Sequence, residues 1–322
     1  LFANNDSIEK VVIPDTVTSI EWNAFYKCSK LKDISFSDGL VSIGDDAFSY
    51  DKLIEKVEIP NTVTSIGSGA FLGCGNLSDV KLSKRLKELG GYAFGDCDSL
   101  TSITIPKSLE KTTQAYYSQY IYNYQWGVFI ACDNLKNINF EEGTTKITNG
   151  LFANNDSIEK VVIPDTVTSI EWNTFYKCSK LKQIDIPDSV TYIGTYGFAG
   201  CVSLEQIKLP KNIASIEEGT FRDCTSLGTI QLPDELQIIR LNTFTNCKNL
   251  KSVEVPSNVT KIEENAFSNC ENLSNITFPE GLTSIGNKAF NLCVNLEKIS
   301  FPDSLQGVGE YAFAECEKLS DI

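Results

Sequence analysis

Apolar and polar positions repeat along this chain with a period of 23 residues. Each repeat has one Phe, which stands three residues before a position that is usually Cys and six before a Leu or Ile. The Phe positions number fourteen: Phe2, Phe25, Phe48, Phe71, Phe94, Phe129, Phe152, Phe175, Phe198, Phe221, Phe244, Phe267, Phe290 and Phe313. A period in the low twenties is typical of a solenoid, in which each repeat forms one coil.

The pattern within a repeat predicts three short elements. Apolar residues two apart before a Pro, as in Ile103 and Ile105 before Pro106, indicate a short parallel strand, and Pro ends it because Pro cannot donate a ladder hydrogen bond. The residue preceding this apolar pair is polar in all fourteen repeats, so one sheet face should be open to water. A V-T-S-I-G stretch, as in 63–67, predicts a second extended segment. The A-F-x-x-C stretch, as in 266–270, has the spacing of one or two helical turns.

These elements predict an α/β repeat fold. We expect a right-handed solenoid of about 14 coils, with short parallel strands on one face and short helical turns at A-F-x-x-C. No coil can bury its Phe, Leu and Ile side chains alone, so the core should form only between coils, around a column of Phe rings. We expect residues 1–322 to be a single solenoid domain and a fragment of a longer array, because the chain begins inside a repeat.

The pattern is interrupted by extra residues between Leu109 and Phe129. The inserted stretch, residues 112–126, contains six large aromatic residues: Tyr116, Tyr117, Tyr120, Tyr122, Tyr124 and Trp126. Insertions in solenoids project from one face, often the binding face, and Tyr and Trp provide contact area at low entropic cost. These six residues are therefore candidate ligand-binding residues. The alternative is a loop whose rings fold back over the flank of the solenoid.

The charge balance limits the classes of partner. With 42 acidic and 28 basic residues the formal net charge is -14, which repels nucleic acid and anionic membranes. The chain has no run of 18 or more apolar residues, so we expect no membrane insertion by this segment.

The eleven Cys residues occupy one position per coil. Neighbouring Cys should therefore lie about 4.8 Å apart, within disulfide range, but parallel side chains must rotate toward each other to bond. Two interpretations stay open: buried free thiols that act as small apolar residues, which we favour, and disulfides between coils. No Cys-x-x-Cys pair is present, which argues against zinc.

The sequence lacks the residues of common catalytic sites. It contains no His, which excludes Ser-His-Asp and Cys-His arrangements and His-bound metals. Adjacent acids occur at 45–46, 141–142, 217–218 and 263–264, mostly in the variable turn before the Phe, where we expect solvated surface rather than a glycosidase pair. We expect no catalytic residue, no metal and no cofactor, and hence not an enzyme.

The unit L-x-x-I-x-I-P-x-x-V-T-S-I-G-x-x-A-F-x-x-C resembles the 23-residue leucine-rich repeat of BspA-like surface proteins of bacteria and some protists. The resemblance covers essentially the whole chain. Besides the insertion, the departures are Asn5, Asp51 and Asn155 at the Cys position and Ser37, Ser83 and Glu141 at the Pro position. The resemblance implies a leucine-rich-repeat solenoid that is secreted or displayed at the cell surface. It also implies adhesion, through binding of extracellular-matrix proteins such as fibronectin or fibrinogen, of cells, or of other microbes.

Residues 1–32 and 151–182 are identical except that Thr174 replaces Ala24. Such copying indicates an array that can change in length, which suits a long interaction surface better than an enzyme site. Our main hypothesis is non-catalytic recognition of a protein partner, with glycans as a second class of ligand. The alternatives are carbohydrate binding through the aromatic insertion and a structural spacer that displays other domains.

Overall fold

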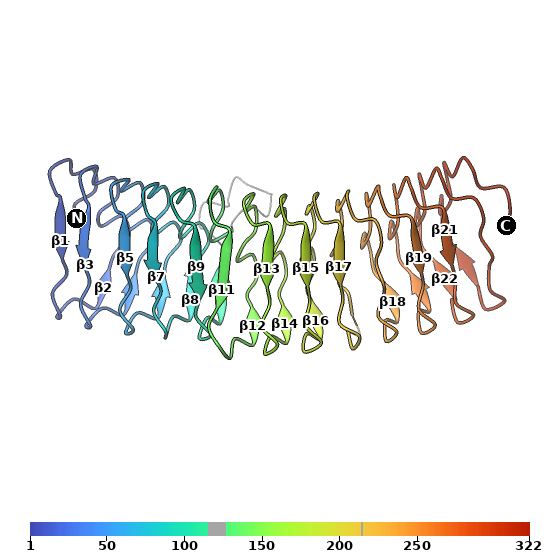
Figure 1. Cartoon of the computed structure of the whole chain (residues 1–322), viewed down its shortest axis with the longest axis horizontal. Helices are drawn as coiled ribbons and strands as arrows, with labels where there is room; N and C mark the ends of the chain where they lie inside the picture. The colour runs from blue at the N-terminus through green and yellow to red at the C-terminus, as the bar shows by residue number, and fades with distance from the viewer. Residues whose placement is uncertain (115–126, 214) are drawn as a thin grey trace. The chain divides into compact units, whose positions relative to one another are not determined.

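The computed structural model describes residues 1–114, 127–213 and 215–322 (Figure 1). These residues form a leucine-rich-repeat β-solenoid of about 12 turns with parallel strands. The 14 predicted coils are counted from the Phe positions, and the structure has fewer turns. Contacts divide the chain into two compact units, Leu1–Ile158 and Glu159–Ile322, which are described separately. The single domain and the right-handed sense stay predictions.

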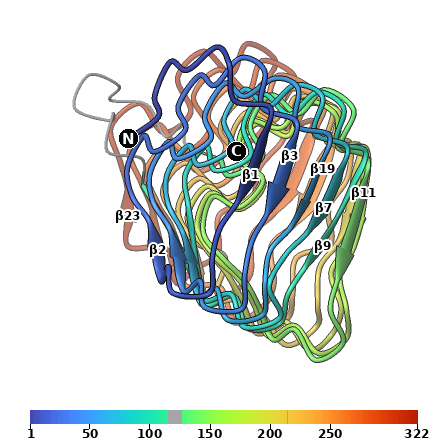
Figure 2. The same cartoon turned by 90° about the vertical axis from the view of Figure 1, so that its left-hand side faces the viewer.

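Most repeats contribute a first strand, which belongs to the strand face, and most contribute a second strand on another side of the coil (Figure 2). In the first unit the strand face consists of β1 (Lys10–Val12), β3 (Asp33–Ser35), β5 (Lys56–Glu58), β7 (Asp79–Lys81), β9 (Ser102–Ile105) and β11 (Asn137–Phe140). The second strands are β2 (Ser19–Ile20), β4 (Ser42–Ile43), β6 (Ser65–Ile66), β8 (Glu88–Gly90), β10 (Lys111–Thr113) and β12 (Lys146–Ile147). Strands β2, β4, β6, β8 and β10 form one parallel sheet.

The second unit repeats this arrangement. Its strand face consists of β13 (Lys160–Val162), β15 (Gln183–Asp185), β17 (Gln206–Lys208), β19 (Ser252–Glu254) and β21 (Asn275–Thr277). Its second strands are β14 (Ser169–Ile170), β16 (Tyr192–Ile193), β18 (Ile238–Ile239), β20 (Lys261–Ile262), β22 (Ser284–Ile285) and β23 (Gly307–Val308). Paired residues are one 23-residue repeat apart, as in Gln183 with Gln206. The short parallel strands predicted from the alternating apolar residues are confirmed.

Within each unit the Phe rings stack in a column, as the sequence predicts. Consecutive rings are nearly parallel, with centroids 5.1 to 5.9 Å apart. The column passes the insertion without a break, because Phe94 and Phe129 stack at 5.6 Å. Here β11 pairs with β9 in register although Ser102 and Asn137 are 35 residues apart in the sequence. The additional residues therefore leave the stacking of the coils unchanged.

The predicted helical turns at A-F-x-x-C are wrong. None of the described residues is helical; this segment, the Phe–Cys turn, is a series of tight turns. The N–H of Cys28 bonds to the carbonyl of Phe25 within its own coil (3.1 Å), but the N–H groups of Phe25 and Lys27 bond to Ala47 and Ser49 of the next coil (2.7 and 2.9 Å). Alternate N–H groups thus point along the solenoid, and a helix cannot propagate.

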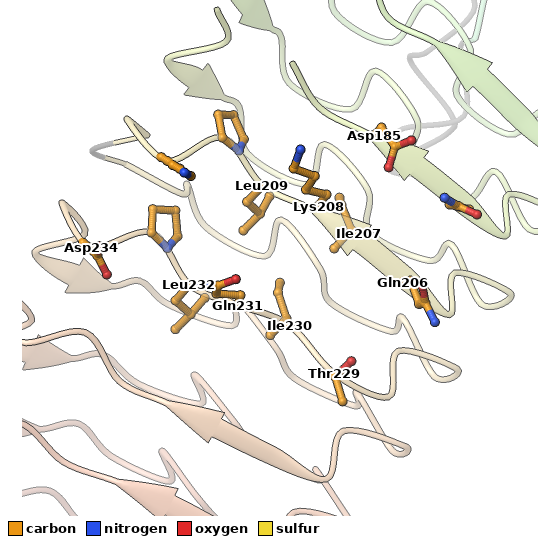
Figure 3. Close-up of a pocket in the computed structure, with 14 residues that line it drawn as sticks. Asp185, Gln206, Ile207, Lys208, Leu209, Thr229, Ile230, Gln231, Leu232 and Asp234 are labelled. Atoms are coloured by element: carbon orange, nitrogen blue, oxygen red, sulfur yellow. The ribbon is translucent and has the colours of Figure 1, made fainter. Parts of the chain in front are cut away.

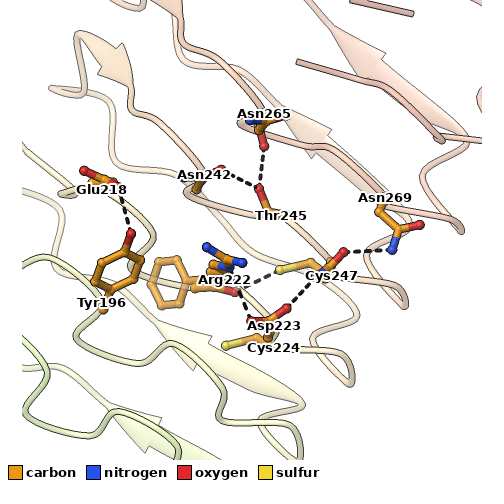
Figure 4. A network of polar contacts seen from close by, with 12 residues as sticks. Tyr196, Glu218, Arg222, Asp223, Cys224, Asn242, Thr245, Cys247, Asn265 and Asn269 are labelled. Carbon is orange, nitrogen blue, oxygen red and sulfur yellow. Dashed lines mark hydrogen bonds and ion pairs between the residues drawn. The ribbon is translucent and has the colours of Figure 1, made fainter. Parts of the chain in front are cut away.

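Left-handed residues four positions apart shape the Phe–Cys turn. Examples are Asn242 and Asn246, with φ of 58° and 61°. Asn and Asp tolerate this conformation better than other residues with a side chain. Their side chains also link coils: the Asn246 amide donates to Asp223 (2.5 Å) and the Asn269 amide donates to Asn246 (2.7 Å) (Figure 4).

The Cys residues are free, and all except Cys316 are buried. Thiols along the solenoid donate to the carbonyl of the Phe in the preceding coil, as Cys74 does to Phe48 at 3.2 Å. Burial raises the pKa of nine of these thiols, to about 12 for Cys201. They therefore stay protonated and act as packed hydrogen-bond donors, as the favoured interpretation of the sequence has it.

Candidate functional site

The strand face exposes two side chains per strand, on either side of a buried one. In β15, Gln183 and Asp185 are exposed around buried Ile184, and β17 repeats this with Gln206 and Lys208. The alternation follows from the two-residue period of a strand. The outward residues differ from coil to coil, so the strand face is a mixed polar surface rather than an array of one functional group.

The strand face consists of several short ladders, which end after β3, β7, β11 and β17. The break after β17 differs from the first three because no strand follows it in the next repeat. Residues 229–231 keep the alternation of exposed and buried side chains but form no strand. In the intact part of the ladder the Ile186 N–H donates to the Lys208 carbonyl at 3.2 Å. No backbone hydrogen bond within the described part of the chain involves residues 229–232. The backbone groups of this segment are thus open to other partners.

Gly228 stands immediately before the segment that forms no strand. Other repeats hold Glu, Lys, Ser or Thr at this position, immediately before the first strand. Gly loses more conformational entropy than any other residue when it is ordered, so it weakens the start of the strand. The Gly228 N–H still reaches the carbonyl of Glu205, at 3.4 Å, and the ladder stops there.

A cleft of about 680 Å³ lies over this interruption (Figure 3). Its apolar floor is formed by Ile207 and Leu209 from one repeat and by Ile230 and Leu232 from the next. All four side chains are buried, so the floor belongs to the packed core and is rigid. The cleft therefore combines a firm apolar base with unpaired backbone groups along one side.

The rim of the cleft carries both charges and amides. Lys208 lies between Asp185 and Gln231 along the second outward position of three successive repeats, and Gln206 and Asp234 are further along the rim (Figure 3). Such a rim offers donors and acceptors of both kinds to a ligand. It presents no nucleophile with an adjacent base, which the acyl-transfer and hydrolytic mechanisms require.

The aromatic residues proposed from the sequence, Tyr116, Tyr117, Tyr120, Tyr122, Tyr124 and Trp126, lie outside the described residues. Their role as ligand-binding residues stays a prediction. The structure describes the ends of the stretch: Thr112 and Thr113 belong to β10, and Gly127 begins the next Phe–Cys turn.

Acids of the pairs at 217–218 and 263–264 are engaged with neighbouring side chains. Glu217 pairs with Arg240 (3.3 Å), Glu263 pairs with Lys261 (3.2 Å), and Glu218 accepts a hydrogen bond from the Tyr196 hydroxyl (2.8 Å) (Figure 4). Within the described ranges, no three or more His, Cys, Asp or Glu residues are grouped so that they could hold a metal ion. No helix in the same ranges is long and apolar enough to cross a membrane.

Sequence reasoning missed the cleft although it contained a signal for it. The repeats at 206–211 and 229–234 have the usual spacing and the usual Pro, and their outward residues look ordinary. The signal was Gly228, a Gly at a position that is otherwise polar with a side chain. A single Gly at this position indicates a weakened strand only when the pairing of the neighbouring strands is known.

The chain is similar to several solved bacterial structures. A leucine-rich repeat protein from Bacteroides ovatus is 27% identical over 96% of this chain and 85% of that chain, with a TM-score of 0.71. A leucine-rich cell surface protein from Faecalibacterium prausnitzii is 25% identical over 98% of this chain and 87% of that chain, with a TM-score of 0.52. Among curated proteins none matches.

The repeat pattern itself matches a protein family across nearly the whole chain. The family is described as BspA type leucine-rich repeat region, and the matched residues are 1–125, 118–227 and 191–320. The stacked Phe rings, the strand ladders and this match lead to one conclusion: the chain belongs to the BspA-type leucine-rich repeat family, whose solved relatives include bacterial cell-surface proteins.

Proposed function

We propose that the chain is a non-catalytic recognition module of a bacterial cell-surface protein, which binds another protein through its strand face. The observation that carries the proposal is the cleft over residues 229–232, where an apolar floor and open backbone groups lie together. An extended segment of a partner can use such backbone groups as an added strand does, while its side chains contact the floor. The similarity to the leucine-rich cell surface protein from Faecalibacterium prausnitzii supports the proposed location at the cell surface.

Protein recognition fits the rim better than a small substrate does. Lys208 and Asp185 place opposite charges side by side, and Gln206 and Gln231 add amides that donate and accept. Mixed polar groups around a buried apolar centre are the usual anatomy of a protein interface. An extracellular-matrix protein of the fibronectin or fibrinogen type is the partner class that the family resemblance suggests.

The test is binding to immobilised fibronectin and fibrinogen. The variant Lys208→Glu/Gln231→Lys changes charge on the rim and should weaken binding by roughly tenfold or more, since residues at the centre of an interface dominate its affinity. The matched control is Val162→Glu on β13, which changes an exposed outward residue of the same unit outside the cleft. It should bind as the unaltered chain does.

A second variant tests the alternative site in the aromatic insertion. Removal of residues 114–125, the twelve extra residues, keeps Thr113 in β10 and should leave binding unchanged if the strand face is the interface. Loss of binding in this variant, with full binding by the rim variant, would assign recognition to the insertion and overturn the proposal. Equal binding by all variants would exclude both sites.

A further inference from the structure

A second hollow, of about 580 Å³, lies on the Phe–Cys turns of the first unit. Tyr26 and Tyr50 from successive coils form two of its walls, with ring centroids 6.0 Å apart and ring planes at 86°. Lys27, Lys52 and Asp6 also line it, and Asp6 belongs to the coil that precedes that of Tyr26. The hollow therefore combines two aromatic surfaces set at a right angle with two ammonium groups.

The position of Tyr50 is fixed by its neighbours. Its backbone is left-handed, with φ of 62°, and its ring lies against Gly73 of the next coil. A Cβ atom at Gly73 would approach the Tyr50 ring to 2.5 Å, so only Gly leaves room for the ring there. Tyr50 keeps 37% of its surface exposed. It is thus a preorganised aromatic platform, which costs little entropy on binding.

The charges of the two lysines are not neutralised by ion pairs among the described residues. The Lys27 ammonium lies 5.0 Å from the Tyr26 ring centroid and 5.4 Å from that of Tyr50. Neither Lys27 nor Lys52 forms an ion pair with a carboxylate among the residues that the structure describes. The nearby Asp6 carboxylate instead accepts the hydroxyl of Ser29 at 2.7 Å. In a chain with a net charge of -14, this hollow offers an anion two ammonium groups that form no ion pair with a carboxylate among the described residues.

The copied block of the sequence repeats part of the lining of this hollow. Five of the seven lining residues recur in the copied block 151–182, including Tyr176 and Lys177 in place of Tyr26 and Lys27. The two others do not recur: Gly200 stands where the first copy has Tyr50, and Val202 stands where it has Lys52. The second aromatic wall and the second ammonium therefore belong to the first copy alone.

We propose that the Tyr26–Tyr50 hollow binds an acidic sugar, a pyranose that carries a carboxylate. The carboxylate would pair with Lys27 and Lys52 through charge-assisted hydrogen bonds. The apolar C–H face of the ring would lie on Tyr50, and the sugar hydroxyls would reach Asp6 and Ser29. Two sources share this chemistry: hexuronates of polysaccharides and terminal sialates of glycoproteins. The site is separate from the strand-face cleft and does not depend on the function proposed for it.

The test uses isothermal titration calorimetry with a hyaluronan tetrasaccharide, which carries hexuronates, and with 3′-sialyllactose, which carries a sialate. Lactose is the neutral control probe. We expect one acidic probe to bind at one site per chain and lactose to bind at least roughly tenfold more weakly, because lactose lacks the charged contact. The probe that binds identifies the source of the sugar. Failure of both acidic probes to bind, or equal binding of lactose, overturns the proposal.

Three variants locate the site. Tyr50→Gly and Lys27→Gln should each reduce the affinity roughly tenfold or more. Lys177→Gln is the matched control, because it makes the same change in the copied block that lacks the second Tyr, and it should leave the affinity unchanged. Thermal unfolding of each variant checks that the fold is intact. Full affinity in folded Tyr50→Gly, or a loss in Lys177→Gln equal to that in Lys27→Gln, overturns the assignment.

A gain of site gives an independent readout. The triple variant Gly200→Tyr/Val202→Lys/Asp223→Gly rebuilds the missing wall, the second ammonium and the Gly on which the ring lies. We expect its stoichiometry to rise from one sugar per chain to two. A folded triple variant that still binds one sugar would show that these residues do not make the site.

Discussion

Asp51 stands at the Cys position of its repeat, where the side chain of other repeats donates a hydrogen bond to the Phe carbonyl of the preceding coil. An ionised Asp51 cannot make this bond, because a carboxylate has no hydrogen to donate. Asn155, at the same position in another repeat, makes the bond because its amide donates to the Phe129 carbonyl at 2.8 Å. Asp51 is fully buried, one carboxyl oxygen accepts the Cys28 N–H at 2.6 Å, and the other has no hydrogen-bond partner among the described residues. Only a protonated Asp51 has a hydrogen to donate at this position.

The stability of the first unit should therefore depend on pH. Burial raises the pKa of Asp51 to about 8, against a smaller opposing effect of the Cys28 N–H. Because an Asp in an unfolded chain has a pKa of about 4, folding favours the protonated form, and this contribution is lost as the pH rises through the folded pKa. Burial also raises the pKa of the neighbouring thiols of Cys28 and Cys74, so they stay neutral over this range.

We predict that Asp51→Asn removes this pH dependence. Relative to the variant, the unaltered chain should lose roughly 1 kcal/mol of unfolding free energy per pH unit from about pH 5 to pH 7.5, and the difference should level off above about pH 8. Urea unfolding of the unaltered chain and of the variant at a series of pH values measures the slope and the pH at which the difference levels off. The control Asp33→Asn, an exposed acid on β3, should keep the slope of the unaltered chain. Parallel profiles for the unaltered chain and Asp51→Asn would contradict the assignment.

At the scale of elements, the strands could be predicted from the sequence and the Phe–Cys turns could not. The alternation in Ile103 and Ile105 has only one structural reading, because a strand places every second residue on the same face. The spacing of A-F-x-x-C fits a helix equally well. The left-handed positions that exclude a helix hold residues as different as Lys27, Tyr50 and Gly73, so no residue type marks them.

The strand-face cleft gives a prediction about one element. Gly228→Lys places the residue found at Lys182 and Lys251 before the segment 229–231. It should let this segment pair as a strand, because Lys loses less backbone entropy than Gly. Hydrogen exchange of the Ile230 and Leu232 amides should slow by about tenfold, as expected for newly bonded groups. Ser274→Lys, at the same position before β21, is the control and should leave these amides unchanged. Unchanged exchange in Gly228→Lys would show that Gly228 is not the cause of the interruption.

At the scale of the whole molecule, stability rests on contacts between coils. Phe71 is fully buried between Phe48 and Phe94, with centroids 5.3 Å away on both sides. Phe2 stacks on Phe25 and keeps 45% of its surface exposed. A ring inside the column therefore contributes to stability through stacking contacts on both of its faces, whereas Phe2 stacks on one face only.

We predict that truncation of these two rings has unequal effects. Phe71→Ala should lower the free energy of unfolding by about 3 to 5 kcal/mol, because it leaves a cavity in a close-packed column. Phe2→Ala should cost about 1 kcal/mol, since little buried area is lost. Urea unfolding of both variants measures the difference. Equal losses would mean that the column does not carry the stability of the first unit.

The pairing of β9 with β11 has a consequence for the gene as well as for the protein. The copied blocks start 150 residues apart, which equals six regular repeats plus twelve extra residues. The extra residues lie between β9 and β11, which still pair in register. Unequal recombination between the two blocks would delete those 150 residues and still join coils whose Phe, Cys and Pro positions match. The shortened product would keep the strand-face cleft and lose Tyr50, Lys52 and the aromatic insertion in a single event. Strains that carry such a deletion would thus display the same scaffold with a narrower range of ligands.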